Sequence, residues 1–578
     1  LQPLEVTLFN DAYDKDRFSN TAWTVDGKIG PLKAVYTGGY LTRRVEQVGD
    51  YTNYARGVYA DYYQCAYLGI AAPVCYSPSS VWHSAEQNQH FQNELRFSSP
   101  DELRLRGIGG IYYEDNKLYD QTGWMYKNLP PCTATVTTGC LTDVGTIPGT
   151  TVQNPGIQGD NTSFYQDQVR ETKQTAFFGS FDFDLVPKQL TLTAGTRYFR
   201  FENSMKGSVL SSFGCYDFGL PPCYVANSPN PYPAPSFGAS YYSYNLDFDR
   251  LSDTETGWRS RVNLTWHIVP DAMVYYTFSQ GFRPGGFNQN GGSPHAYLNL
   301  GPPSGGSPIA PNQPNPPQYL IPRSYSSDDL TNNEIGWKTE FLDHRVLFNG
   351  AVYREKWNNV QIEFFNPGVV GNLFYDTNGQ DFLIKGIETQ VVARVVTGLT
   401  VQGAANWNQS EQQNAPSLLV TNPYAPNYGK PITNACNLFF ATCQAVSNPF
   451  GTVGSPTANS PPLHYSLGAR YDWTMAGGYA PFIQFGATHN GHSFTQAGAN
   501  PTYHLGGTVS TSRGRFENPA YSVFSAATGV EKDAWYFTLS CENLSNSNAS
   551  TFVSSQQFIT AQTPLRPRVI MGTFGYKF

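Results

Sequence analysis

The chain has 578 residues, of which 15% are aromatic and only 14% are charged, and its formal net charge is −7. That charge is small for the length and includes no cluster of Lys or Arg, so nucleic acid is excluded as an expected partner. No uncharged apolar run approaches the roughly 18 residues that a membrane-spanning helix needs. A membrane protein of this composition must cross the bilayer with alternating strands, as β-barrels do.

Short runs of alternating apolar and polar residues follow one another along the whole chain, and short turns join them into hairpins. The pattern predicts about eighteen strands. In chain order they cover residues 4–9, 21–30, 32–45, 89–97, 103–113, 172–185, 189–201, 261–268, 272–279, 333–342, 345–364, 382–396, 399–409, 463–473, 479–489, 520–530, 535–543 and 566–578.

The hairpin over residues 258–288 shows the pattern most clearly. Its apolar residues Val262, Leu264, Trp266 and Ile268 alternate strictly with polar ones. In a water-soluble sandwich such a face would enter a core. The aromatic residues near the strand ends are instead typical of girdles at a membrane interface, and the charged opposite face suits a water-filled lumen.

Between hairpins the connections are long and irregular. They cover residues 51–88, 116–171, 202–254, 288–332, 366–381, 414–462 and 490–519. Residues 288–332 could also be a disordered linker, but similar strands resume after them, which favours a surface loop. We therefore predict an all-β, transmembrane antiparallel β-barrel with short periplasmic turns and long extracellular loops, surrounded by outer-membrane lipid. Phe578, the last residue of an alternating strand, is similar to the assembly signal of outer-membrane proteins.

Eight of the nine cysteines fall into four close pairs within these loops. Such local pairs predict small disulfide-closed loops in an oxidising compartment. Zinc is the competing interpretation, but the pairs lack the two-residue spacing and histidine partners of a zinc knuckle. The ninth, Cys541, continues an apolar strand face and is expected to be a buried or lipid-facing free thiol. The predicted pairs are Cys65 with Cys75, Cys132 with Cys140, Cys215 with Cys223, and Cys436 with Cys443.

Several segments resemble the TonB-dependent transporters of the Gram-negative outer membrane. They are residues 275–288 (YYTFSQGFRPGGFN), 333–338 (NEIGWK) with 349–353 (NGAVY), and 542–544 (ENL) with the closing residues 575–578 (GYKF). The resemblance implies a 22-stranded barrel with an amino-terminal plug domain, preceded by a segment that engages TonB. We find neither in residues 1–578, so this chain is expected to be the barrel domain, with the plug and about four strands upstream of Leu1.

The resemblance implies TonB-dependent active import of a scarce solute, with a ferric siderophore or another iron complex preferred. The strand count leaves open a passive, porin-like channel of eighteen strands for sugars or amino acids. No nucleophile elbow and no zinc-protease motif is present, so an enzyme is not expected, nor is a cofactor. His489, His492 and His504 fall close together and hint at haem or metal, but residues 283–285 depart from the motif of haem receptors.

Two residues are candidates for ligand contact, Arg283 and Asn288, because they lie where a strand emerges into the longest glycine-rich loop. Charged residues on the polar strand faces are expected mainly to pair with one another across strands inside the barrel. These residues are Glu94 and Arg96, Arg104 and Arg106, Asp182 and Asp184, and Arg470 and Asp472.

Overall fold

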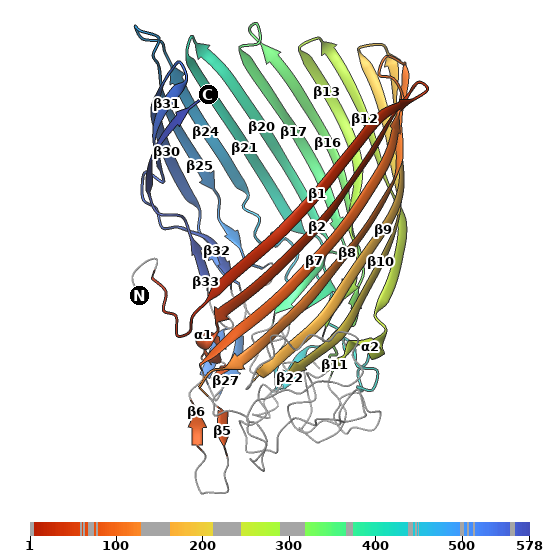
Figure 1. Cartoon of the computed structure of the whole chain (residues 1–578). Helices are drawn as coiled ribbons and strands as arrows, with labels where there is room; N and C mark the ends of the chain where they lie inside the picture. The colour runs from red at the N-terminus through yellow and green to blue at the C-terminus, as the bar shows by residue number, and fades with distance from the viewer. Residues whose placement is uncertain are drawn as a thin grey trace.

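The computed structural model describes residues 5–57, 60–61, 64–66, 74–76, 79–128, 162–211, 244–289, 318–365, 374–436, 443–445, 448, 450–496, 502–505, 508–511, 515–554 and 561–578. Its dominant feature is one antiparallel sheet of eighteen strands, which curls into a barrel wall (Figure 1). Two helices of one turn each, α1 (Thr52–Ala55) and α2 (Leu246–Asp249), lie at the end of the wall that carries the long loops. Among these residues, no helix has the length and apolar character to cross a membrane.

The wall follows chain order, with each strand antiparallel to the next. Its strands are β1 (Tyr13–Ile29), β2 (Leu32–Asp50), β7 (Ser80–Ser98), β8 (Leu105–Tyr126), β9 (Thr162–Val186), β10 (Leu190–Ser211), β12 (Ser252–Val269), β13 (Ala272–Arg283), β16 (Asp328–Phe341), β17 (Val346–Asn358), β20 (Phe382–Val396), β21 (Leu399–Gln412), β24 (Leu463–Asp472), β25 (Ala480–Asn490), β30 (Tyr521–Lys532), β31 (Trp535–Glu542) and β34 (Val569–Tyr576). The eighteenth, β11 (Tyr244–Asn245), pairs with the end of β10. Within the described residues β1 and β34 are the two edges of the sheet and do not pair with each other.

The remaining strands form small two-stranded sheets in the loop regions. These are β3 (Arg56–Gly57) with β4 (Ala60–Asp61), β5 (Gln64–Ala66) with β6 (Val74–Tyr76), β14 (Gly286–Phe287) with β15 (Ser324–Tyr325), β18 (Gln361–Phe365) with β19 (Phe374–Asn378), β22 (Asn434–Cys436) with β23 (Cys443–Ala445), β26 (Ser493–Phe494) with β29 (Glu517–Asn518), β27 (Thr502–Leu505) with β28 (Thr508–Thr511), and β32 (Ser550–Ser554) with β33 (Ala561–Pro564).

All but one of the predicted strands correspond to long strands of the wall, so the predicted fold class is confirmed. The prediction over residues 4–9 is wrong, because residues 5–9 form no strand. Its apolar run has no neighbouring strand, and the backbone N–H of Phe9 instead donates to the carboxylate of Asp50. The prediction over residues 345–364 merges β17 and β18, which are separated near Asn359, a residue with a positive φ of 53°.

Strands β7, β8, β9 and β10 begin or end far beyond their predicted bounds, and β9 has 25 residues although its prediction starts at residue 172. The aromatic side chains of the outer face mark where the alternation stops. Tyr40 lies opposite Phe91, and Tyr198 lies opposite both Phe177 and Trp258, forming a band across neighbouring strands. Phe177 is 50% and Trp258 60% exposed, as expected of side chains that face lipid. Beyond this girdle both faces of the strands carry mostly polar side chains, and the strands continue as a hydrogen-bonded ladder.

The inner face carries charged side chains that pair with one another, as expected. Arg106 of β8 forms a bidentate ion pair across the sheet with Asp184 of β9, at 2.7 and 2.9 Å. The other predicted pairings need correction. Arg96 contacts Glu94 at 3.1 Å and Arg470 contacts Asp472 at 2.9 Å along the same strand rather than across two strands. Residues two apart on a strand share a face, which explains this geometry.

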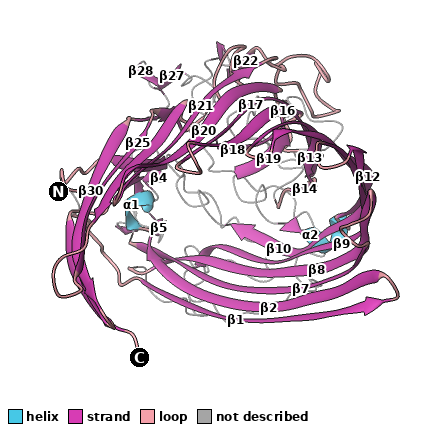
Figure 2. Ribbon diagram, turned by 90° about the horizontal axis from the view of Figure 1, so that it is seen from above, coloured by secondary structure: helices cyan, strands magenta, loops and turns pink. Residues whose placement is uncertain are grey.

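At the loop end of the wall, β13 turns into the barrel. Its ladder with β12 ends at Ser279, and from Gln280 to Arg283 it pairs with β16 alone. Phe282 stacks at 4.1 Å on Phe199, a buried residue of the inner face of β10. Figure 2 shows that β14, β18 and β19 lie inside the ring of strands. The loops after β13, β17 and β21 therefore fold into the mouth of the barrel rather than away from it.

These three loops share a hydrophobic core of their own. The core joins the segment before β15, the β18–β19 hairpin and the loop after β21, and it consists of Tyr319, Ile321, Tyr375, Leu418, Val420, Ala425, Ile432 and Phe450, with Ile362 packed against it. A core of this size fixes the loops relative to one another because each buried apolar side chain contributes about 1.5–3 kcal/mol. We call this assembly the loop cap.

The structure leaves the disulfide prediction untested but places two cysteine pairs in register. Cys65 is the ladder partner of Cys75 in β5–β6, and Cys436 is the partner of Cys443 in β22–β23. Directly opposed residues in an antiparallel ladder have Cα atoms about 4.5–5.5 Å apart, within the range of disulfides. The other two predicted pairs, Cys132 with Cys140 and Cys215 with Cys223, lie outside the described residues.

Peptide mapping without reduction is expected to recover two disulfide-linked peptides. One joins Cys65 to Cys75, and the other joins Cys436 to Cys443. Cys541, a free and half-buried cysteine of β31, provides the internal control and should remain a thiol under the same conditions. Recovery of all these cysteines as alkylated thiols from protein isolated without reductant would contradict the prediction.

Candidate functional site

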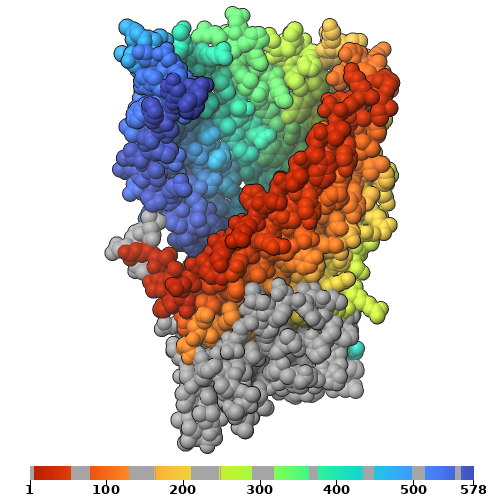
Figure 3. Space-filling view, in the orientation of Figure 1, coloured from red at the N-terminus to blue at the C-terminus, as the bar shows by residue number. Residues whose placement is uncertain are grey.

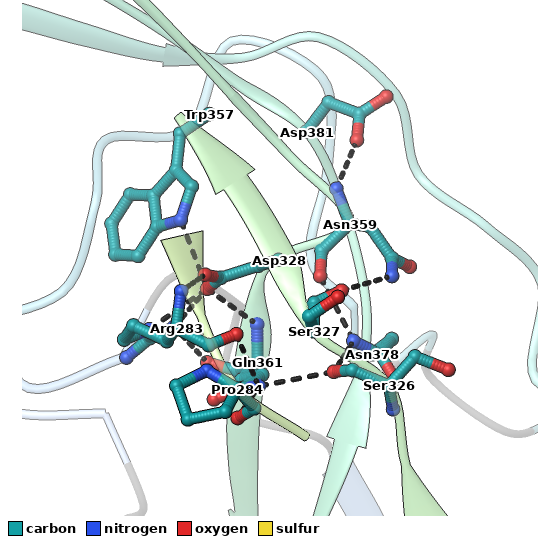
Figure 4. Close-up of polar contacts among 10 residues, drawn as sticks. All are labelled: Arg283, Pro284, Ser326, Ser327, Asp328, Trp357, Asn359, Gln361, Asn378 and Asp381. Carbon is teal, nitrogen blue, oxygen red and sulfur yellow. Dashed lines mark hydrogen bonds and ion pairs between the residues drawn. The ribbon is translucent and has the colours of Figure 1, made fainter. Parts of the chain in front are cut away.

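The ends of β13, β16 and β17 meet around one buried carboxylate (Figure 4). The side chain of Asp328, the first residue of β16, is only 1% exposed. It accepts hydrogen bonds from the backbone N–H of Arg283 at 3.0 Å, from Nε of the same residue at 2.8 Å, and from Nε1 of Trp357 at 3.0 Å. A buried carboxylate is stable only when it is paired and hydrogen-bonded in this way, so Asp328 acts as a hub that holds three strands together.

Arg283, one of the two predicted site residues, is held by this hub but is not enclosed. Its guanidinium donates to the carbonyl oxygen of Gln361 at 3.1 Å and lies 4.9 Å from the ring centroid of Trp357. The side chain is nevertheless 49% exposed. An arginine fixed by one carboxylate and one aromatic face keeps donors available in a fixed direction, which suits recognition of an anion.

Asn288, the other predicted site residue, is only 5% exposed. Its Nδ2 donates to the carbonyl oxygens of Pro322 at 2.9 Å and Asp376 at 2.8 Å, and its Oδ1 accepts from the backbone N–H of Asp376 at 2.8 Å. The side chain thus joins the segment after β13 to β19 and gives Asn288 a structural role in the loop cap. Direct contact of Asn288 with a ligand stays a prediction.

Arg170, Tyr325 and Asp376 also lie near Arg283. Sequence analysis did not identify these three as candidate site residues. Asp376 of β19 is partly buried, and burial raises the pKa of its carboxyl group, while the nearby guanidinium groups of Arg170 and Arg283 act to lower it. Burial also raises the pKa of Tyr325, with Asp376 adding to the effect. Two arginines and a phenol therefore lie around one carboxylate at the mouth of the barrel.

Arg170 is exposed, as Arg283 is. It lies on the inner face of β9, and its Nη2 has a long contact of 3.5 Å with Oε1 of Gln168. Within the described part of the chain, no carboxylate is within ion-pair distance of it, whereas Arg283 is paired with Asp328. Gln168 is itself fully buried and donates to Oε1 of Gln289 at 2.8 Å, which shows how closely the segment after β13 covers this wall. We call Arg170, Arg283, Tyr325 and Asp376 the mouth cluster.

Residues 3–544 match the family described as TonB dependent receptor-like, beta-barrel. The chain belongs to this family. TonB-dependent receptors are transporters and not enzymes, and their barrels cross a membrane, as the sequence predicted for this chain.

Several solved structures share the fold of this TonB-dependent receptor barrel. The ferric yersiniabactin uptake receptor FyuA from Yersinia pestis aligns with 98% of this chain and 62% of its own, at 10% identity and a TM-score of 0.61. The siderophore receptor PiuA from Acinetobacter baumannii aligns with 98% and 65%, at 13% identity and a TM-score of 0.56. The copper transporter OprC aligns with 98% and 66%, at 10% identity and a TM-score of 0.53. The chain spans less than two thirds of each of these structures. No curated protein matches it in sequence.

Two of the three histidines that hinted at haem or metal have described side chains, and each lies against a different aromatic ring. His489 belongs to β25 rather than to a loop, and its ring stacks on Tyr465 at 5.0 Å. His492 lies against Phe494 instead, with ring centroids 5.9 Å apart, and the side chain of His504 lies outside the described residues. No group of three or more potential metal ligands occurs in the described ranges.

Proposed function

We propose that this chain is the barrel of an active transporter that imports an anionic iron complex, most simply a ferric siderophore, across the outer membrane of a Gram-negative bacterium. Membership of the TonB-dependent receptor family supports active transport. The observation that supports an anionic ligand is the exposed guanidinium of Arg170, which has no ion pair among the described residues and lies near Arg283 in the mouth cluster.

The chemistry of the mouth cluster fits such a ligand. Ferric chelates present oxygen donors and carry negative charge when catecholate or carboxylate groups hold the metal. Guanidinium groups bind such oxygens through charge-assisted hydrogen bonds, and they do so best where walls of low dielectric exclude water. The indole of Trp357 and the phenol of Tyr325 add flat apolar surface of the kind on which aryl groups pack.

Energised release would require TonB, which in the proposed transporter engages an amino-terminal segment connected to a plug domain. The alternative, a passive channel for sugars or amino acids, is distinguished from this proposal by its energy requirement. A passive channel equilibrates its solute at a rate set by the gradient, whereas a TonB-dependent transporter stops when the proton gradient is collapsed.

The test is uptake of radiolabelled iron by cells that carry the receptor, supplied as an anionic catecholate, an anionic citrate or a neutral hydroxamate chelate. The expected result is saturable uptake of an anionic chelate that disappears in a TonB-deficient strain or after addition of a protonophore. Unsaturable uptake that persists in both cases, or equal uptake of sugars, would favour the passive channel.

The raised pKa of Asp376 predicts a pH dependence of binding. As the pH falls from neutral toward this pKa, the carboxylate takes up a proton, and the mouth cluster loses the negative charge that opposes an anionic ligand. Affinity is therefore expected to rise as the pH is lowered toward this pKa.

The Asp376→Asn variant should bind the same chelate more tightly at neutral pH and should lose most of this pH dependence. Comparing the two proteins over the same pH series by fluorescence titration removes the contribution of the chelate's own protonation. An unaltered pH profile in the variant would exclude Asp376 as the titrating group.

A further inference from the structure

A second group of cationic side chains lies on the outer surface of the barrel, away from the mouth cluster. β1 runs obliquely across this surface (Figure 3), and in its register with β2 Arg17 lies directly opposite Arg44. Both side chains are exposed. By strand alternation they share a face with Trp23 of β1 and Tyr40 of β2, so they point outward, toward the lipid side and beyond the aromatic girdle.

Several other charged side chains around this position are paired. On the same face, Glu46 contacts Lys15 at 3.7 Å and accepts a hydrogen bond from the hydroxyl of Tyr13 at 2.7 Å. On the opposite face, Arg43 pairs with Asp16 at 2.6 Å. Arg17 and Arg44 have no ion pair or hydrogen bond through their side chains within the described residues. Like charges directly opposite each other destabilise a sheet. An anion bound between Arg17 and Arg44 would relieve this repulsion.

The surroundings of the two arginines supply neutral hydrogen-bonding groups. Gln87 of β7 is the register partner of Arg44 on its other side. The next outward-facing row toward the girdle consists of Ser19, Thr42 and Gln89, and the hydroxyls of the first two lie 3.3 Å apart. Below this row come the aromatic side chains that face lipid. From the rim toward the membrane, the surface is therefore first cationic, then rich in hydroxyl and amide groups, and then aromatic. A lipid of the outer leaflet has the same order, with its headgroup outermost and its acyl chains below.

We propose that Arg17 and Arg44 bind a phosphate group in the headgroup of an outer-leaflet lipid, whose acyl chains run down the aromatic face below them. Guanidinium groups bind phosphate oxygens bidentately, and two of them on one face can share one phosphate. The hydroxyl and amide groups of the adjoining row contact the remaining oxygens of the headgroup. A lipid is favoured over a soluble anion because the cationic pair is continuous with the lipid-facing surface.

The test uses the receptor extracted from its membrane and delipidated in a neutral detergent, with the double variant Arg17→Gln/Arg44→Gln. Binding is measured by native mass spectrometry with three probes, namely lipid A, lipid A treated with phosphatase, and inorganic phosphate as a competitor. The unaltered protein is expected to bind lipid A, and the double variant is expected to bind it at least tenfold more weakly. Phosphatase treatment of the lipid should produce a similar loss.

The matched control is Arg43→Gln, which removes an adjacent arginine that points to the inner face and is already paired. It should retain lipid A binding. Heat-modifiable mobility on electrophoresis establishes that each variant forms a folded barrel. Equal binding of lipid A by the double variant, equal binding of the dephosphorylated lipid, or complete competition by millimolar inorganic phosphate would each overturn the proposal.

Discussion

Replacement of Asp328 by Ala is expected to release the segment that follows β13 from the barrel wall. The substitution leaves the backbone N–H of Arg283 and Nε1 of Trp357 without their acceptor, and it removes the anion that holds the guanidinium of Arg283 in place. Breaking a buried and hydrogen-bonded pair by removing one partner costs about 3–5 kcal/mol. The wall itself is expected to remain folded, because its ladder extends far beyond this position.

Hydrogen exchange followed by mass spectrometry checks this result. Amides of β13 near Arg283, of β15 and of the β18–β19 hairpin should exchange at least a hundredfold faster in the variant, while those of β8 and β9 should not change. Asp329→Ala is the matched control, because Asp329 is exposed and makes one surface ion pair with Arg259, worth less than about 1 kcal/mol. Similar exchange in both variants would show that Asp328 is not the hub.

Reversal of charge at Arg170 is expected to have the largest effect on ligand binding. At an effective dielectric constant near 20, a charge about 6 Å from the ligand contributes on the order of 2–3 kcal/mol. Arg170→Glu should therefore weaken binding of an anionic ferric chelate by about a hundredfold or more, and Arg170→Gln by about tenfold to a hundredfold. The loss should shrink as ionic strength rises, because salt screens exposed charges.

Equilibrium titration with the chelate that gives saturable uptake measures this effect. Arg200→Gln is the control, since Arg200 lies on the outer face of β10 and pairs there with Glu202. It removes the same charge from the same region of the wall without touching the lumen. If Arg200→Gln and Arg170→Gln weaken binding equally, the overall charge of the barrel and not the mouth cluster determines affinity.

The membrane-spanning part of the fold could be predicted from the sequence because lipid and water impose opposite polarity on the two faces of each strand. Where that constraint acts, as in β12 with Val262 and Trp266 facing outward, the alternation is strict and the prediction held. Beyond the girdle both faces meet water, so the alternation disappears although the ladder continues. For this reason Arg170 was assigned to a loop instead of to β9.

The candidate site could be predicted only in part. Arg283 was found because a strand visibly ends there and a glycine-rich loop begins. Its grouping with Asp328 and Asp376 depends on loops that fold inward, and nothing in the local pattern specifies the direction of a loop. The buried position of Asn288 has the same origin, since a polar residue after a strand is more often exposed than enclosed between two backbone segments.

The continuation of β9 past the aromatic girdle also determines how far the receptor reaches. Its fifteen residues before Phe177 lie beyond the girdle, and at roughly 3.3 Å per residue and a tilt near 45° they raise the rim about 35 Å above the girdle. The rim on this side of the barrel is therefore surrounded by water and stands well clear of the aromatic girdle.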